Sequence, residues 1–111
     1  MITQLIYSMT DRPVMNHVVE IKDREINLYS YGSLVCSLRD ASQCDKIIVF
    51  GRDYRYSRTT MKYLVDFLRQ NGFTDLDSIK AVDDLIKHDE VYGHTNVNGK
   101  VVMAWVDDTM Y

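Results

Sequence analysis

The sequence lacks several features that would define a class of protein at once. It contains a single proline, which argues against a disordered chain. Its two cysteines, Cys36 and Cys44, have a spacing that fits no zinc-binding pattern, so we expect a reduced intracellular pair. The phosphate-loop pattern GxxxxGK[ST] is missing, and no internal repeat or low-complexity segment is visible.

Signals for export and for membrane insertion are also missing. Residues 1–5 lack the basic start and the apolar core of a signal peptide. No apolar run approaches the length of a membrane span. We therefore expect an intracellular protein with no membrane partner.

What is present indicates one folded domain, residues 1–111, with 46% apolar and 26% charged residues. The net charge of −3 is uneven, because residues 71–111 hold three basic against eight acidic residues. Residues 46–70 instead hold six basic and two acidic residues. A local basic patch on an acidic protein can hold an anion or an acidic partner, but it differs from the broad basic surface of a general DNA-binding protein.

Apolar patterns predict the strands. Alternating or continuous apolar runs cover residues 2–9, 17–21, 26–31, 34–38, 46–50, 91–97 and 100–106. Residues 11–13 are expected to form a turn, and 26–31 and 34–38 are open as one hairpin or one bent strand with a glycine bulge. The turn signal Asn98-Gly99 predicts a hairpin, and the run 101–106 predicts a strand covered on both faces.

Two helices follow from spacing and caps. Ser57 is the expected N-cap of the first, Met61, Leu64 and Leu68 recur on one face, and Asn71-Gly72 ends it. Lys62, Asp66, Arg69 and Gln70 are expected on its solvent side. The second helix is expected to begin after a cap at Thr74 or Asp77 and to run to about His88. The fold class predicted is α+β, a mostly antiparallel sheet of about five strands with two helices packed on one face.

The first candidate site is the loop before the first helix. Arg52, Tyr54, Arg55, Tyr56 and Arg58 lie at or just before a helix N-terminus, where the helix dipole disfavours cations. A phosphate or carboxylate held there, or stacking on single-stranded nucleic acid, would explain them. The structural alternative has the tyrosines anchor the loop and the arginines lie in water. Strand-like alternation would place both tyrosines on one side and Arg55 on the other.

The second candidate site is the acidic second half of the chain. Its proposed contact residues are Asp75, Asp77, Asp83, Asp84, Asp89 and Glu90. They suit a basic partner surface, and a solvated acidic helix is the alternative.

Catalysis and metal binding find little support. Cys36 lies in an apolar strand, where an inert buried thiol is expected. His17 stands alone in a strand and is expected to be structural. His88, Asp89, Glu90 and His94 straddle a helix end and a loop, which favours a solvated terminus over a metal site. We expect no enzyme activity, no metal and no cofactor.

The segments Tyr29-Ser30-Tyr31 and 49–64 carry the pattern Tyr-x-Tyr-Ser-x-Thr-Thr-helix. Through it the chain resembles a group of small uncharacterised accessory proteins of phages and other bacterial mobile elements. Lone domains of such elements are often inhibitors of host defence, anti-CRISPR proteins among them. The resemblance implies a non-enzymatic protein of the bacterial cytoplasm that binds and inhibits a defence nuclease complex. The acidic residues would meet a nucleic-acid channel, and the Arg/Tyr loop would contact a second surface.

Two alternatives stay open. One is a module that binds nucleic acid or a phosphate ligand through the loop 51–60. The other is a homodimer formed through an exposed strand edge.

Overall fold

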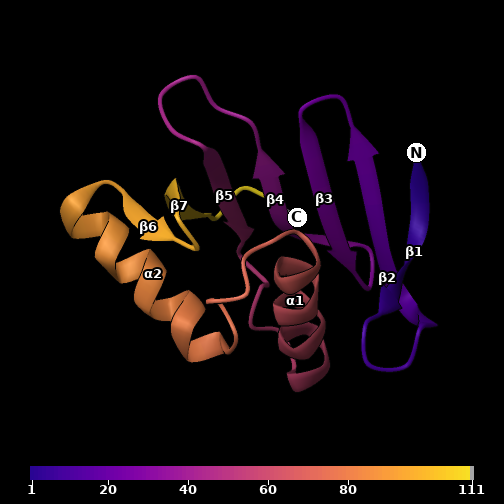
Figure 1. The fold of residues 1–111 in the computed structure, drawn as a ribbon. Helices are drawn as coiled ribbons and strands as arrows, with labels where there is room; N and C mark the ends of the chain where they lie inside the picture. Colours follow the sequence, from indigo (N-terminus) through magenta and orange to yellow (C-terminus); the bar gives the residue numbers. More distant parts are fainter. Residues whose placement is uncertain (111) are drawn as a thin grey trace.

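The computed structural model describes residues 1–110 and contains a seven-stranded sheet with two helices on one face (Figure 1). In chain order the elements are β1 (Ile2–Tyr7), β2 (Arg12–Lys22), β3 (Glu25–Ser30), β4 (Ser33–Arg39), β5 (Lys46–Gly51), α1 (Arg58–Gln70), α2 (Ile79–Tyr92), β6 (Thr95–Val97) and β7 (Lys100–Asp107).

The strand order is β1-β2-β3-β4-β5-β7-β6, and β5 with β7 is the parallel pair in an otherwise antiparallel sheet. Parallel neighbours cannot be joined by a tight turn, so the chain leaves β5, passes through both helices and returns through β6. Figure 1 shows α1 and α2 side by side on the same face as a result. The loop between β5 and α1 is the start of this crossover.

The expectation of about five strands was wrong, although the α+β class with two helices was right. The runs 26–31 and 34–38 form a hairpin, because Tyr31 and Gly32 adopt positive φ angles of 52° and 82°. The three-residue strand β6 pairs with β7 and adds another strand to the sheet. The turn expected at residues 11–13 lies instead at residues 8–11, and only Asp11 of the expected range belongs to it, because Arg12 and Pro13 lie within β2. The first residues of β2 pair only with β1, so the missing N–H of Pro13 costs no bond to β3.

The first helix begins as predicted, since the Ser57 side chain accepts a hydrogen bond from the Thr60 N–H. The cap of α2 is Ser78, not Thr74 or Asp77. The helix also continues to Tyr92, into the run expected to be a strand. The predicted Asn98-Gly99 turn is present, with positive φ at both residues.

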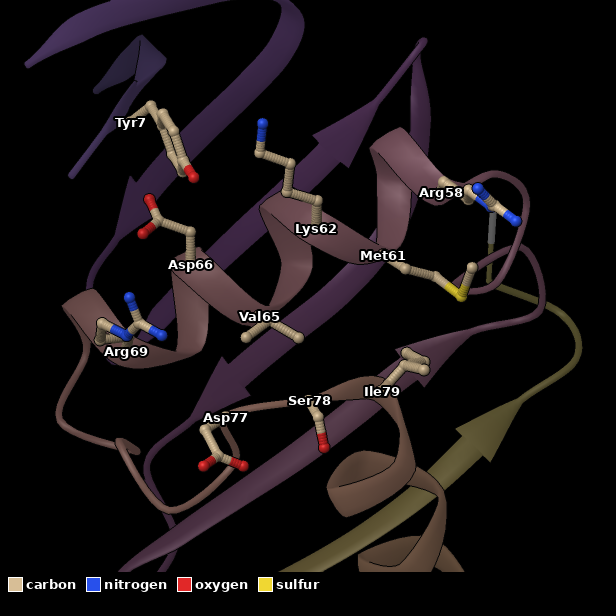
Figure 2. A pocket seen from close by; sticks show the side chains of 10 residues that line it. All are labelled: Tyr7, Arg58, Met61, Lys62, Val65, Asp66, Arg69, Asp77, Ser78 and Ile79. Carbon is tan, nitrogen blue, oxygen red and sulfur yellow. The ribbon is translucent and has the colours of Figure 1, made fainter. Parts of the chain in front are cut away.

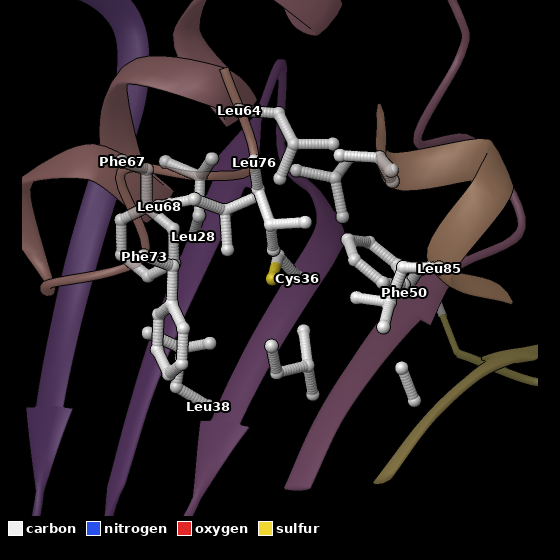
Figure 3. Close-up of a cluster of buried hydrophobic side chains, with 14 of the residues drawn as sticks. Leu28, Cys36, Leu38, Phe50, Leu64, Phe67, Leu68, Phe73, Leu76 and Leu85 are labelled. Carbon is white, nitrogen blue, oxygen red and sulfur yellow. The ribbon is translucent and has the colours of Figure 1, made fainter. Parts of the chain in front are cut away.

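The core lies between the helices and the sheet (Figure 3). Leu64, Phe67 and Leu68 of α1 pack with Phe73 over the middle strands, and Leu85 of α2 lies against Phe50 of β5. Within residues 1–110, both helices lie on this face and the opposite face of the sheet carries none. Trp105 on β7 remains 37% exposed, so the expectation that β7 is covered on both faces was wrong.

Among residues 1–110, neither helix has the length and apolar character required to cross a lipid bilayer.

Candidate functional site: a tyrosine-flanked pocket beside the loop before α1

The loop between β5 and α1 is fastened to α2. The Tyr54 hydroxyl donates a hydrogen bond of 2.8 Å to Asp83, whose other oxygen lies 3.2 Å from the Arg55 guanidinium. The Tyr54 ring also packs on Phe50, with ring centres 5.6 Å apart. Tyr54 therefore points inward and Arg55 is held in an ion pair, which fixes one side of the loop.

This anchorage changes the acidity of Tyr54 and predicts a pH dependence of stability. Burial above all, and then the hydrogen bond to the Asp83 carboxylate, raise the pKa of Tyr54 to about 12. Between pH 10 and 12 the unfolded chain loses this proton while the folded chain keeps it, so stability falls as pH rises through that window. We expect the urea midpoint of the wild type to fall more steeply there than that of Tyr54→Phe. Parallel curves for the two proteins would contradict the assignment.

Tyr56 points the opposite way. Its side chain is 71% exposed, and its ring lies 6.4 Å from that of Tyr31, which is 55% exposed and follows β3. The strand-like alternation expected for Tyr54 and Tyr56 was wrong, because the loop turns. The Tyr54 N–H donates to Gly51 and the Tyr56 N–H to Asp53, so the two rings leave the backbone in different directions.

A pocket of about 160 Å³ lies beside these two tyrosines. It is lined by Ser30, Tyr31, Ser33, Val35, Asp53, Tyr56 and Thr60. Asp53 is the single charged residue in that lining, and its carboxylate has no hydrogen-bond or ion-pair partner within residues 1–110. The pocket thus combines two exposed aromatic rings, hydroxyl groups and one unpaired carboxylate.

A chain of hydrogen bonds forms the floor of the pocket. His17 Nδ1 lies 2.9 Å from the Met15 carbonyl, and its Nε2 lies 3.0 Å from Ser30 Oγ. Ser30 Oγ is 2.9 Å from Thr60 Oγ1, which lies 3.2 Å from the Oγ of the helix cap Ser57. A carbonyl only accepts, so Nδ1 of the neutral imidazole donates and Nε2 accepts. Ser30 then donates to His17, Thr60 to Ser30, and Ser57 to Thr60.

His17 is therefore a fully buried structural residue that ties β2 to β3 and, through Ser30, to α1. Ser30 is 4% exposed, so its hydroxyl is not presented to solvent. The network therefore holds the end of β3 and the start of α1, which form two walls of the pocket, in a fixed relative position.

The substitution Thr60→Val tests whether the hydrogen-bond chain at the pocket floor stabilises the fold. Valine keeps the shape of threonine but leaves Ser30 and Ser57 without their shared partner, which should cost about 2 kcal/mol of unfolding free energy. Urea denaturation measures the loss. Thr59→Val is the matched control, because Thr59 is exposed and should change stability by less than about 0.5 kcal/mol. Equal midpoints for the two variants would show that the buried chain adds nothing.

A second, shallower hollow lies between α1 and the start of α2 (Figure 2). Met61 and Val65 of α1 face Ile79 of α2 across it, and its volume is about 340 Å³. Arg58, Lys62 and Arg69 stand around it and point apart rather than toward a common point. The Lys62 ammonium lies 4.7 Å from the centre of the Tyr7 ring.

The structure does not bring the three loop arginines together. Arg52 is exposed, Arg55 is paired with Asp83, and Arg58 belongs to the hollow along α1. Of the predicted loop residues, only Tyr56 lines the tyrosine-flanked pocket.

The acidic residues do not form one free surface either. Asp83 was expected to face water, but its side chain is only 20% exposed because it holds the loop. Asp84 pairs with Lys80 at 2.9 Å, and Asp75 accepts a hydrogen bond from the Asn98 N–H. The remaining three are the exposed Asp77 and Glu90 and the half-buried Asp89. No group of side chains within residues 1–110 has the arrangement of a metal site.

Sequence reasoning missed Asp53 and Ser33 as parts of a site, whereas it included Thr60 among the hydroxyl groups of the loop and helix start 51–60. The signal that could have located the pocket was the pairing of Tyr29-Ser30-Tyr31 with the Ser-x-Thr-Thr helix start, because these two segments supply Ser30, Tyr31 and Thr60 to its lining. Nothing in the spacing indicated that a hairpin turn and a helix cap would meet.

The fold and this pocket describe a small α+β domain in which a crossover loop and a hairpin turn share one site. The chain belongs to the Family of unknown function (DUF8033), whose model matches residues 4–84. The matched region includes every residue that lines the tyrosine-flanked pocket. No curated protein and no solved structure matches the chain at a significant level.

Proposed function

We propose that this protein is a non-catalytic binding protein, and that it inhibits a bacterial defence nuclease complex through the face that carries Tyr31 and Tyr56. The observation that carries the proposal is the position of these two tyrosines. They come from separate elements, are both largely exposed, and stand together beside a pocket. Tyrosine gives a large contact area at a low entropic cost, and exposed aromatic residues beside pockets often dominate protein interfaces.

The reactive groups support a role in binding. Burial raises the pKa of the Cys36 thiol far above its ordinary range, so the thiolate that a nucleophile requires is disfavoured. The neighbouring pair of Ser30 and His17 is buried, and each member is used in the pocket floor. Asp53 has no histidine or lysine beside it in the pocket lining.

The charge distribution supports a basic target such as a nucleic-acid-binding nuclease. Asp53, Asp77 and Glu90 have no ion-pair partner within residues 1–110, and the chain is acidic overall. Unpaired carboxylates would orient the protein toward a positively charged channel and speed association more than they would raise affinity.

The test is a pull-down from bacterial lysate with and without nuclease treatment. The wild type is compared with a Tyr31→Ser, Tyr56→Ser variant, and Tyr92→Ser is the control because Tyr92 is 65% exposed at the distant end of α2. We expect a protein that survives nuclease treatment, is lost with the double variant and is kept by the control. Purified target should then be inhibited by the wild type and by the control, but not by the double variant. If the double variant captures the same protein as the wild type, the proposed binding face is rejected.

The acidic residues allow a second comparison, because the structure divides them. Neutralising Asp77, Asp89 and Glu90 should slow association with the target while leaving the fold intact. Neutralising Asp75, Asp83 and Asp84 should act through stability, since these side chains hold Asn98, the loop and Lys80. Unchanged inhibition of every tested nuclease after neutralising all six would reject the channel-blocking form of the proposal.

Binding of single-stranded nucleic acid or a phosphate ligand is the second candidate. One observation favours it: Arg58, Lys62 and Arg69 line one exposed side of α1, and none has an ion-pair partner within residues 1–110. Fluorescence anisotropy with a labelled single-stranded oligonucleotide tests it. If it holds, Arg58→Ala with Lys62→Ala should weaken binding and lower the slope of log affinity against log salt by about 0.7 for each phosphate that the variant no longer neutralises. No binding at low salt would remove this candidate.

A further inference from the structure

We propose that the tyrosine-flanked pocket binds the guanidinium group of an arginine side chain presented by the protein target. This inference rests on the proposed function, because it names what the target inserts at that face. It depends on the size, the charge and the hydrogen-bonding character of the pocket.

The size of the pocket restricts the ligand to one side-chain end. Its volume is about 160 Å³. Pockets that bury nucleotides and other drug-sized ligands begin at about 300 Å³, so a ligand of that class would not be enclosed here.

The charge in the pocket favours a cation. The half-buried Asp53 carboxylate is the only charged group in the lining, and it has no partner within residues 1–110. An unpaired carboxylate attracts a cation, and a planar guanidinium is the partner whose paired N–H groups match it best.

The aromatic rings favour the same ligand. Tyr31 and Tyr56 both line the pocket with ring centres 6.4 Å apart, and they are 55% and 71% exposed, so their ring faces are partly open to a ligand. A guanidinium stacks on such faces and gains a cation–π attraction, which a neutral amide does not.

The hydroxyl groups of the pocket floor are not available as hydrogen-bond donors to a ligand. Because His17 Nδ1 donates to the Met15 carbonyl, every hydroxyl hydrogen of Ser57, Thr60 and Ser30 is used within the chain that ends at His17. Ser30 and Thr60 are 4% and 0% exposed, so their hydroxyls are closed to a ligand. A phosphate requires donors, and the floor supplies none to it.

One feature points toward an anion. The N-terminus of α1 adjoins the pocket, and its dipole favours negative charge. Ser57 already takes up the Thr60 N–H, and Asp53 brings a full negative charge where the dipole brings a partial positive one. The balance therefore favours the cation, and a phosphate titration tests it directly.

Nuclear magnetic resonance titration of the full chain is the test. The probes are N-acetyl-arginine methylamide, its neutral isostere N-acetyl-citrulline methylamide, and inorganic phosphate, at matched ionic strength. We expect the arginine probe to shift the amide resonances of residues 30–33 and 53–57 in a saturable way. The citrulline probe should bind at least threefold more weakly. Equal binding of both, saturable shifts with phosphate instead, or no saturable shift with arginine would each overturn the inference.

Asp53→Asn supplies the variant arm. The Asp53 side chain has no partner within residues 1–110, so the variant should keep the wild-type spectrum while its arginine affinity falls at least threefold. Asp23→Asn, on an exposed residue of the β2–β3 turn at the end of β3 opposite to the pocket, should leave that affinity unchanged. Unaltered arginine affinity in Asp53→Asn would reject the carboxylate as the anchor.

The two proposals fail in different ways. If the double tyrosine variant loses the lysate protein but Asp53→Asn still captures it, the arginine inference is rejected and the binding function stands. Specific arginine binding without any captured protein would reject the binding function alone.

Discussion

Replacing Gly51 with alanine is expected to cost about 3 kcal/mol of unfolding free energy or more, or to prevent folding. A Cβ atom at this position would lie 2.0 Å from the carbonyl oxygen of Leu34 and 3.2 Å from the Cα of Val35. Both atoms belong to the backbone of β4, where the β3–β4 pairing is irregular, so no side-chain rotation relieves the clash. The strand β5 would have to separate from β4, and both strands lie in the middle of the sheet.

Gly93→Ala is the matched control. Gly93 caps α2 with a φ of 77°, and an added Cβ there meets no atom within 4 Å. Alanine at Gly93 therefore carries only the left-handed backbone cost of about 1 kcal/mol. Urea denaturation of both variants measures the difference. A loss at Gly51 no larger than that at Gly93 would show that the strands move apart at little cost.

Gly51 also shows how the site depends on the fold. It is the last residue of β5, and the loop with Asp53 and Tyr56 begins directly after it. Close contact with Leu34 and Val35 sets that loop against the start of β4, which supplies Ser33 and Val35 to the pocket.

Local signals were sufficient to predict parts of this fold. The Ser57 cap and the apolar stripe of α1 depend on residues within one or two turns of each other, and both are present. The Asn98-Gly99 turn is equally local. The strand count was too low because the turn at Tyr31 needs a positive φ at a residue other than glycine, which left 26–31 and 34–38 open as one strand. Of the run 91–97, only Thr95–Val97 form β6, since α2 extends to Tyr92.

The site could be predicted only in part. The sequence drew attention to the loop before α1, since its arginines and tyrosines lie at a helix start. It did not show that Tyr54 and Arg55 are held by Asp83, a residue of the other helix. That pairing depends on how α2 packs beside the loop, and no spacing along the chain encodes it.

Asp66 was expected on the solvent side of α1 but is only 2% exposed, and its replacement is the other change with a large expected effect. One carboxylate oxygen accepts hydrogen bonds from the Ser8 N–H at 3.1 Å and from the Gln70 side chain at 2.7 Å. The second oxygen accepts a hydrogen bond from the Ser8 hydroxyl. Gln70 also donates to the Ile6 carbonyl, so the carboxylate fastens the β1–β2 turn to α1.

Asp66→Ala should cost about 3 kcal/mol of unfolding free energy, because it removes charge-assisted hydrogen bonds and leaves the Ser8 N–H without its partner. Asp66→Asn should lose less, since an amide oxygen still accepts from Ser8 while its NH₂ group cannot accept from Gln70. Asp77→Ala, on an exposed aspartate beside the same hollow, is the control and should change stability by less than about 0.5 kcal/mol.

Hydrogen exchange separates the local effect from the global one. If Asp66 acts as a fastener, its loss should release the amides of β1 and of the first residues of β2, which pair only with each other at this edge of the sheet. Amides of β4 and β5 should lose protection only in proportion to the fall in overall stability. Uniform loss across all strands would mean that the carboxylate supports the whole core rather than this edge. In either case, a residue that helical spacing alone assigns to solvent is held in the interior by a turn 58 positions earlier in the chain.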